Sequence, residues 1–274
     1  MSAAALQTWR LDDGRQTLVL ASEGGALPAV VWWGAPLPAG EDLAELARAG
    51  RPDLTGGMLD ALAPVTLLPL AGRGFAGVPG LAGRDGAGRP LEPRLVLTAV
   101  EAEEGALRFR AEDGEAGLAW EAAIAADAAS GVLTLQAALE AREPITVDWL
   151  AAPVLPLPPA ARRLTEFTGG WIGEMRPVQS ALAPGLRARD NRTGRSDHAH
   201  FPGLLLEAEG ATEAAGEVWQ LAYGWPGGHG HAVEVFADGR GQIQFGHARG
   251  SWRGPARRFA TAPLYAAWSG QGRA

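Results

Sequence analysis

Residues 190–201, DNRTGRSDHAHF, concentrate charged side chains in a chain in which 47% of the residues are hydrophobic. Opposite charges this close in sequence can form ion pairs, and an arginine fork that holds a carboxylate or backbone carbonyls is a common way to fix a long loop. Asn191 favours a turn, because its short side chain hydrogen-bonds to nearby backbone. We therefore expect a structural loop, braced by ion pairs among Asp190, Arg192, Arg195 and Asp197.

Two pairs of histidines raise the possibility of metal binding. His198 and His200 are two residues apart, as are His229 and His231. On a strand, residues with this spacing share a face, so either pair can present two imidazoles to one ion. A metal site needs further ligands, and no carboxylate triad marks either pair. Packing or surface histidines are the preferred interpretation, and we expect no metal ion and no other cofactor.

Residues 168–177, TGGWIGEMRP, combine an indole, a carboxylate and a guanidinium in Trp171, Glu174 and Arg176. Glu174 has the chemistry of a glycosidase acid, but that reaction needs two carboxyl groups held about 5 to 10 Å apart. Spacing alone nominates no partner for it. The ten tryptophans of the chain invite a sugar-binding interpretation, since an indole packs on the apolar face of a pyranose. Most tryptophans of a β-sandwich fill its core instead.

Composition excludes several classes of function. The 274 residues carry a net charge of −7, so no basic face favours nucleic acid. Cysteine is absent, which rules out disulfides, thiolate nucleophiles and cysteine-bound metals. No secretory signal and no run of about 20 apolar residues can be recognised. We expect a cytoplasmic protein without a membrane partner.

Strand-like runs separated by turn residues recur along the whole chain and predict an all-β fold. In residues 106–114, apolar Leu107 and Phe109 alternate with Arg108 and Arg110, which is the period of a half-buried strand. No alternation of strands with helices appears, so the turn spacing favours an antiparallel sandwich or barrel. The expected strands lie within residues 16–22, 29–34, 94–103, 106–114, 117–127, 131–141, 146–157, 202–209, 217–225, 231–239, 241–246 and 257–269.

Helix is expected to be scarce, and residues 41–50, EDLAELARAG, form the best candidate. Leu43, Leu46 and Ala47 lie on one face of it, and Gly50 is a stop signal.

The segment 53–93 is rich in glycine and proline and contains no run more strand-like than VTLLPL. A loop of that length inside a compact domain is usually functional or disordered. Residues 155–164 are the nearest feature to a hinge, yet no linker divides the chain convincingly. We therefore predict a single domain over 1–274.

Six stretches, taken in order, resemble the N-terminal region of bacterial α-galactosidases (melibiases) of glycoside hydrolase family 36. The order and spacing of these stretches run through nearly the whole chain, which makes the resemblance more specific than any one motif. They are WWGAPL at 32–37, GGMLDALAPVTLLPLAGRGFAGVPGL at 56–81, TGGWIGEMRPV at 168–178, DNRTGRSDHAHFP at 190–202, GEVWQLAYGWPGGH at 216–229 and FATAPLYAAWSGQG at 259–272.

The resemblance implies a large antiparallel β-supersandwich, similar to galactose mutarotase, with very little helix. In this family the nucleophile and the acid/base aspartate belong to a following (β/α)8 barrel, and a small C-terminal β domain comes after it. Neither catalytic motif occurs in these 274 residues. A retaining glycosidase has no covalent route without its nucleophile. We therefore expect no catalytic residue here and no hydrolysis of α-galactosides by this chain alone.

The family resemblance also implies roles for particular residues. In related homo-oligomers, loops of this domain narrow the sugar pocket of a neighbouring barrel, and the matching positions are Asp60, Arg73 and Trp33. These residues are expected to touch α-galactosides of the raffinose or melibiose type in an intact enzyme; the alternative is a capped turn, a structural ion pair and a core tryptophan. The expected structural signature of the sandwich, its barrel contacts and its subunit contacts comprises Trp171, Glu174, Arg176, Arg192, Arg195 and His200.

Two other functions remain open at this point. A free-standing carbohydrate-binding module would keep the fold without the barrel. A sandwich enzyme that epimerises sugars would need a histidine base in a cleft, and His198 or His229 would have to supply it.

Overall fold

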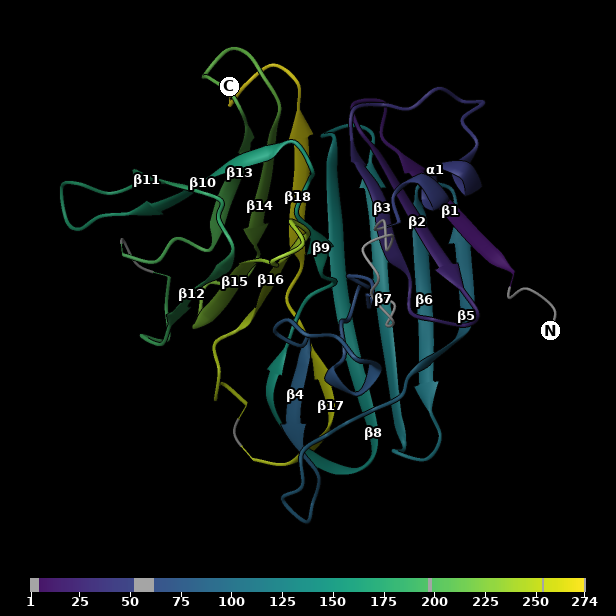
Figure 1. Cartoon of the computed structure of the whole chain (residues 1–274). Helices are drawn as coiled ribbons and strands as arrows, with labels where there is room; N and C mark the ends of the chain where they lie inside the picture. The colour runs from purple at the N-terminus through teal and green to yellow at the C-terminus, as the bar shows by residue number, and fades with distance from the viewer. Residues whose placement is uncertain (1–4, 52–61, 197–198, 253, 274) are drawn as a thin grey trace.

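The computed structural model describes residues 5–51, 62–196, 199–252 and 254–273. Antiparallel strands make up almost all of its regular structure, as predicted (Figure 1). The helices are α1 (Leu43–Ala49) and the short 3-10 turn η1 (Ala71–Arg73). The strands are β1 (Leu6–Asp12), β2 (Thr17–Glu23), β3 (Ala29–Gly34), β4 (Leu81–Arg84), β5 (Val96–Glu103), β6 (Ala106–Asp113), β7 (Leu118–Asp127), β8 (Val132–Leu150), β9 (Leu155–Pro156), β10 (Ala161–Thr168), β11 (Arg176–Ala181), β12 (Gly185–Asn191), β13 (Gly203–Ala208), β14 (Val218–Tyr223), β15 (His229–Val235), β16 (Gly241–His247), β17 (Ala256–Ala260) and β18 (Leu264–Ser269).

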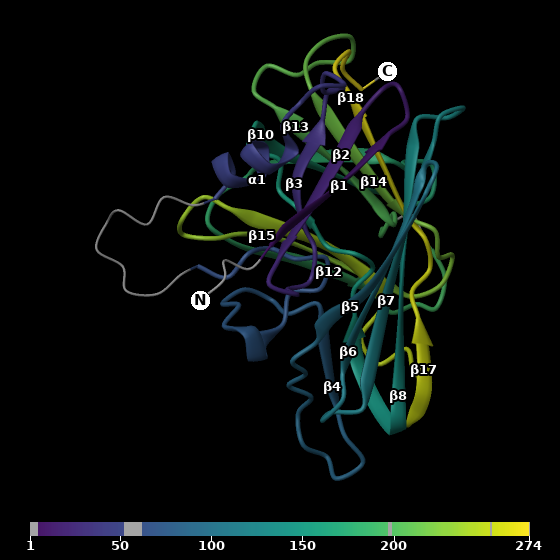
Figure 2. The same ribbon diagram turned by 90° about the vertical axis from the view of Figure 1, so that its right-hand side faces the viewer.

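Three sheets contain these strands. The largest has eleven strands and follows the order β11-β10-β13-β14-β18-β8-β7-β6-β5, with β17 and β4 also paired to β8. A three-stranded sheet, β1-β2-β3, and a four-stranded sheet, β12-β15-β16-β9, lie on one side of it (Figure 2). The fold class is therefore the expected antiparallel β-sandwich.

One continuous core joins all three sheets. Strand β7 illustrates how the strands contribute to this core: Leu118, Trp120 and Ile124 are almost completely buried and alternate with more exposed residues. They pack in a cluster that includes Leu20 of the three-stranded sheet and Phe245 of the four-stranded sheet. Period-two alternation therefore places one face of each strand in a shared interior.

The structure corrects several details of the predicted elements. The expected strand within 131–141 and the first part of the one within 146–157 form the single 19-residue strand β8, and Leu155–Pro156 forms β9. The expected strand within 257–269 is divided into β17 and β18. VTLLPL forms no strand and makes only a bridge between Thr66 and Ala29, although its leucines are buried. Strands β10, β11 and β12 arise where the sequence shows no apolar alternation. Helix α1 is confirmed, with Asp42 as N-cap and Gly50 as C-cap.

Within the long segment 53–93, Val78 is hydrogen-bonded to the four-stranded sheet. Gln242 and Gln244 each donate a hydrogen bond to the carbonyl oxygen of Val78, at 2.8 and 2.7 Å. Glu234 accepts from the Val78 backbone N–H at 2.8 Å. Polar side chains on a sheet face thus satisfy the backbone of a segment that forms no ladder of its own. Within the described chain, no helix has the length and apolar character to cross a bilayer.

Candidate functional site

The hairpin β10–β11 presents the TGGWIGEMRP sequence at its tip, which projects from the body of the sandwich (Figure 1). Trp171 is 82% exposed and Ile172 is 84% exposed. Ile172 and Met175 have φ angles of 64° and 54°, in the left-handed region that a β-branched or bulky residue rarely adopts. Glu174 supports this backbone, because its Oε1 accepts from the Ile172 N–H at 3.1 Å. The tip therefore holds apolar side chains outward on strained backbone.

Asn191, the last residue of β12, has a buried side chain that shapes the turn after the strand. Its Oδ1 accepts from the Thr193 N–H at 2.9 Å, and its Nδ2 donates to the Arg195 carbonyl at 2.7 Å. Arg192 lies 3.2 Å from Asp190 in an ion pair. Asn191 thus makes the turn that its residue type favours. Of the four charged residues expected to pair, Asp197 lies outside the described residues, as does His198.

Beside this turn, a buried carboxylate joins two sheets. Glu166 of β10 is 1% exposed, and its Oε1 lies 3.0 Å from Nε2 of His231 on β15. Arg187 of β12 donates to Oε2, and Arg189 lies 3.5 Å from Oε1. Arg189 also donates to the Ala199 carbonyl at 2.7 Å and contacts Nδ1 of His200 at 3.4 Å. One acid therefore connects the eleven-stranded sheet, the four-stranded sheet and the loop that carries His200.

The electrostatics of this cluster favour a charged Glu166. Burial opposes ionisation, but the hydrogen bonds and charges of His231 and Arg187 outweigh it and hold the pKa of Glu166 at about 2. A carboxylate that stays ionised at neutral pH and is surrounded by cations is an anchor, not a proton donor.

Residues Arg187 and Arg189 were not among the sequence candidates, nor was Glu166. The signal that could have found them is the pattern GLRARDN at 185–191. On a strand, two arginines two residues apart lie on one face and require an acid there if that face is covered.

The two other histidines of the four-stranded sheet, His229 and His247, are buried among neighbouring groups. His229 is 2% exposed and its Nδ1 lies 3.2 Å from the Gly227 carbonyl oxygen. His247 lies edge-on to the rings of Trp225 and Trp252, and burial lowers its pKa. Among the residues that the structure describes, no group of three or more histidines, aspartates or glutamates has the arrangement of a metal site. An epimerase base must reach its substrate, and the side chain of His229 is almost completely buried in this structure.

The three residues expected at a sugar pocket have different surroundings. Trp33 is 7% exposed, and its indole N–H donates to Oε1 of Gln16 at 2.9 Å. Arg73 is exposed, and its Nη2 donates to the carbonyls of Arg94 and Leu95 at 3.1 and 2.9 Å. Asp60 lies outside the described residues. The contacts of Trp33 are those of the core alternative, and those of Arg73 anchor η1 to the chain that enters β5.

Comparison with known proteins now decides the family. The profile of the glycosyl hydrolase family 36 N-terminal domain matches residues 26–251. This chain belongs to that family. An α-galactosidase of Escherichia coli is 33% identical over 241 residues, which are 86% of this chain and 32% of the relative. The family 36 chain therefore spans about a third of the length of this curated relative.

Solved structures show the same fold. The family 36 α-galactosidase AgaA A355E of Geobacillus stearothermophilus, in complex with 1-deoxygalactonojirimycin, matches with a TM-score of 0.84 at 20% identity. The match covers 97% of this family 36 chain and 41% of AgaA. The galactosidase domain of the α-galactosidase-sucrose kinase AgaSK matches with a TM-score of 0.83 at 16% identity, over 97% and 41% of the two chains. The expected supersandwich is confirmed.

Proposed function

We propose that residues 1–274 act as one non-catalytic domain of a cytoplasmic α-galactosidase that hydrolyses terminal α-galactosyl residues. The domain supports a catalytic barrel, contributes to contacts between subunits and shapes the galactose pocket. The continuous core supports a single domain, since it includes residues from Leu11 to Ala266. The absence of cysteine supports a reducing compartment.

The exposed hairpin tip is the observation that carries the contact role. Trp171, Ile172 and Met175 expose apolar area to water, and contiguous exposed apolar patches mark interaction sites. The left-handed backbone at Ile172 and Met175 costs free energy, and such strain concentrates at functional positions. A tip that served only to close the hairpin would place glycine at these two positions. We assign it to a protein surface, either the barrel or a neighbouring subunit.

The pocket role rests on the segment that contains Asp60 and Arg73. Arg73 donates to the carbonyls of Arg94 and Leu95, and Val78 is hydrogen-bonded to the four-stranded sheet. These bonds support the rigidity that a substrate contact by Arg73 requires. Asp60 lies outside the described residues. Substrates of the raffinose or melibiose type are supported by related structures: other forms of AgaA have been solved in complex with stachyose and with raffinose.

The first experiment measures hydrolysis by the purified chain. No release of the aryl group from an aryl α-galactoside is expected, because neither the nucleophile motif nor the acid/base motif of the family occurs in these 274 residues. Release at ordinary enzymatic turnover would refute the non-catalytic role.

The second experiment uses an intact α-galactosidase that contains this domain. Replacing Trp171, Ile172 and Met175 by serine should weaken subunit assembly or barrel docking, seen by analytical ultracentrifugation and by lower thermal stability. Val96→Ser, at a residue that is 44% exposed on β5, is the matched control and should change neither. Unchanged assembly and stability in the triple variant would remove the contact role.

A further inference from the structure

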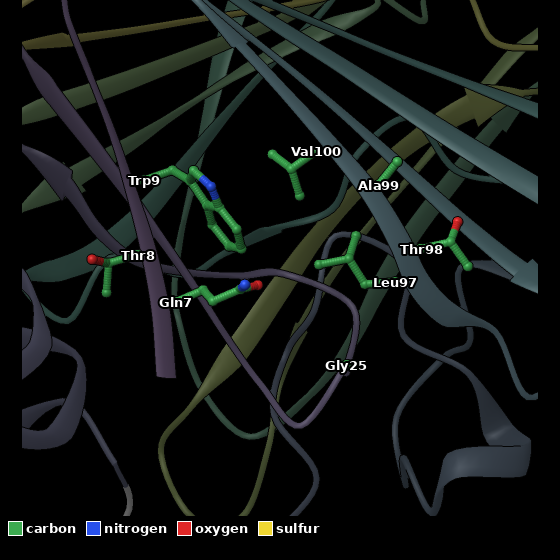
Figure 3. Close-up of a pocket in the computed structure, with 8 residues that line it drawn as sticks. All are labelled: Gln7, Thr8, Trp9, Gly25, Leu97, Thr98, Ala99 and Val100. Atoms are coloured by element: carbon green, nitrogen blue, oxygen red, sulfur yellow. The ribbon is translucent and has the colours of Figure 1, made fainter. Parts of the chain in front are cut away.

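A groove with a volume of about 530 Å³ lies between β1 and β5 (Figure 3). Both strands are at the edges of their sheets, since β1 pairs only with β2 and β5 only with β6. Gln7 and Trp9 point into the groove from β1; Thr8, between them, also lines the groove, but its side chain points away. Leu97 and Val100 line the opposite side. The volume is within the roughly 300–1,000 Å³ of small-molecule sites.

The groove forms where the hydrophobic core ends, at the start of β1. Leu11, Trp9 and Gln7 lie on one face of β1, and their side chains change from buried to half-buried to exposed toward the start of the strand. Trp9 is held in place by Phe109 of β6, with ring centroids 5.2 Å apart in an edge-to-face arrangement. Its indole is therefore a preorganised surface at the mouth of the sandwich.

The chemistry of the walls selects a neutral ligand. In a chain with a net charge of −7, none of the residues that line the groove is charged. Among the described residues, the structure records no hydrogen bond of the Trp9 indole N–H or of the side-chain amide of Gln7. An indole, an amide with both donors and an acceptor, and the aliphatic surfaces of Leu97 and Val100 match the apolar face and hydroxyl edge of a pyranose.

An extended peptide fits the groove less well. The N–H of Leu97 donates to the carbonyl of Gly25 at 2.9 Å, so the β2–β3 turn is joined to β5 at one end of the groove. The pairing register of β5 also shifts between Leu97 and Ala99. A bulge interrupts the even row of backbone groups that an added strand needs. These features favour a compact ligand.

We propose that the groove between β1 and β5 binds a neutral pyranose unit of a saccharide, stacked on Trp9 and hydrogen-bonded by Gln7. None of the residues that line the groove is among those assigned to the galactose pocket or to the hairpin contact. The groove would therefore give the domain a saccharide-binding site of its own.

Nuclear magnetic resonance of the 274-residue chain tests the proposal, with methyl α-galactoside and melibiose as probes. Titration should give saturable shifts of the Gln7 side-chain amide, the Trp9 indole N–H and the Leu97 backbone amide. Trp9→Ala should abolish binding. Gln7→Ala should weaken it roughly fivefold through loss of one hydrogen-bonding partner. Because Gln7 is exposed, this second variant should keep its fold even if Trp9→Ala does not.

Two control variants separate this site from others. Thr8→Ala changes the neighbouring side chain that points away from the groove, and Trp171→Ser changes the exposed tip of the β10–β11 hairpin; both should bind like the original chain. Absence of shifts at tens of millimolar sugar would overturn the proposal, as would binding that Gln7→Ala leaves unchanged. A neutral extended peptide that shifted the same resonances at lower concentration than either sugar would also overturn it, in favour of strand docking.

Discussion

Nε2 of His231 lies 3.0 Å from Oε1 of Glu166, and this contact joins strands of different sheets. Strand β10 belongs to the eleven-stranded sheet and β15 to the four-stranded sheet. Arg187 and Arg189 of β12 contact the same carboxylate. Burying a carboxylate is unfavourable unless cations and donors surround it, so the junction of β10, β12 and β15 depends on all of these groups together.

Acid should weaken the protein through Glu166. Its pKa in the folded chain, about 2, is below the ordinary value of 4.5, so the folded state binds this proton less readily than the unfolded state. The stabilisation is therefore present above pH 4.5 and is lost as the pH falls toward 2. Urea unfolding at pH 7, 4 and 3 should show Glu166→Gln to be less stable than the original chain at pH 7, by about 3 kcal/mol. The difference should shrink at low pH.

Glu140→Gln is the control for this measurement, because Glu140 forms a 3.3 Å pair with Arg258 on the surface. Exposed ion pairs contribute about 0 to 1 kcal/mol, so the free energy of unfolding of this variant should be close to that of the original chain at every pH. A Glu166→Gln variant with the original pH dependence would contradict the assigned role of the buried carboxylate.

Arg273 should contribute measurably to stability although it is near the end of the chain. It donates to Oε1 of Glu207 at 2.7 Å, and Glu207 is fully buried. Arg163 and Thr165 contact the same carboxylate. Arg273→Ala should reduce the free energy of unfolding by about 1 to 3 kcal/mol, because it removes a charged partner of a buried group. Thermal unfolding measures this, and Arg258→Ala, at a surface pair, should have almost no effect. Equal melting temperatures for the two variants would refute the prediction.

Gly246 should not tolerate a side chain. A Cβ atom there would lie 2.7 Å from the Leu150 carbonyl oxygen and 3.0 Å from Cη2 of Trp149. The backbone atom cannot move without disturbing β8, so Gly246→Ala should destabilise the chain by about 1 to 3 kcal/mol. Gly40→Ala, where a Cβ would meet nothing within 4 Å, is the matched control. Urea unfolding followed by circular dichroism measures the stability of both variants. Equal stability would show that β8 and β16 can move apart enough to accept the extra methyl group.

Removing the strain at the hairpin tip should have opposite effects on the stability of the isolated chain and on the assembly of an intact enzyme. Ile172→Gly and Met175→Gly place the residue that prefers positive φ at angles of 64° and 54°. Each single variant of the isolated chain should melt at the same or a slightly higher temperature, with a gain of up to about 1 kcal/mol. In an intact enzyme the same changes remove exposed apolar area and should weaken assembly. Lower stability of the isolated chain would mean that these side chains support the hairpin itself.

The strands of the central sheet could be predicted from sequence, and several edge strands could not. β6 and β7 bury one face, so their apolar residues alternate visibly along the chain. β11 has no buried residue, and β12 carries Arg187 and Arg189 where a buried face would carry apolar residues. Its inward face is polar because Glu166 lies opposite, and a single sequence does not reveal that partner.

The sequence by itself determined the all-β class, helix α1, the turn at Asn191 and the family. Each of these depends on neighbours within a few residues or on a run of motifs in order. Only the tertiary structure decided that Trp33 is covered, that Trp171 is exposed and that Glu166 joins two sheets. Exposure and pairing across sheets depend on contacts between residues distant along the chain, such as the 65 residues that separate Glu166 from His231. Local residue preferences contain no information about these distances.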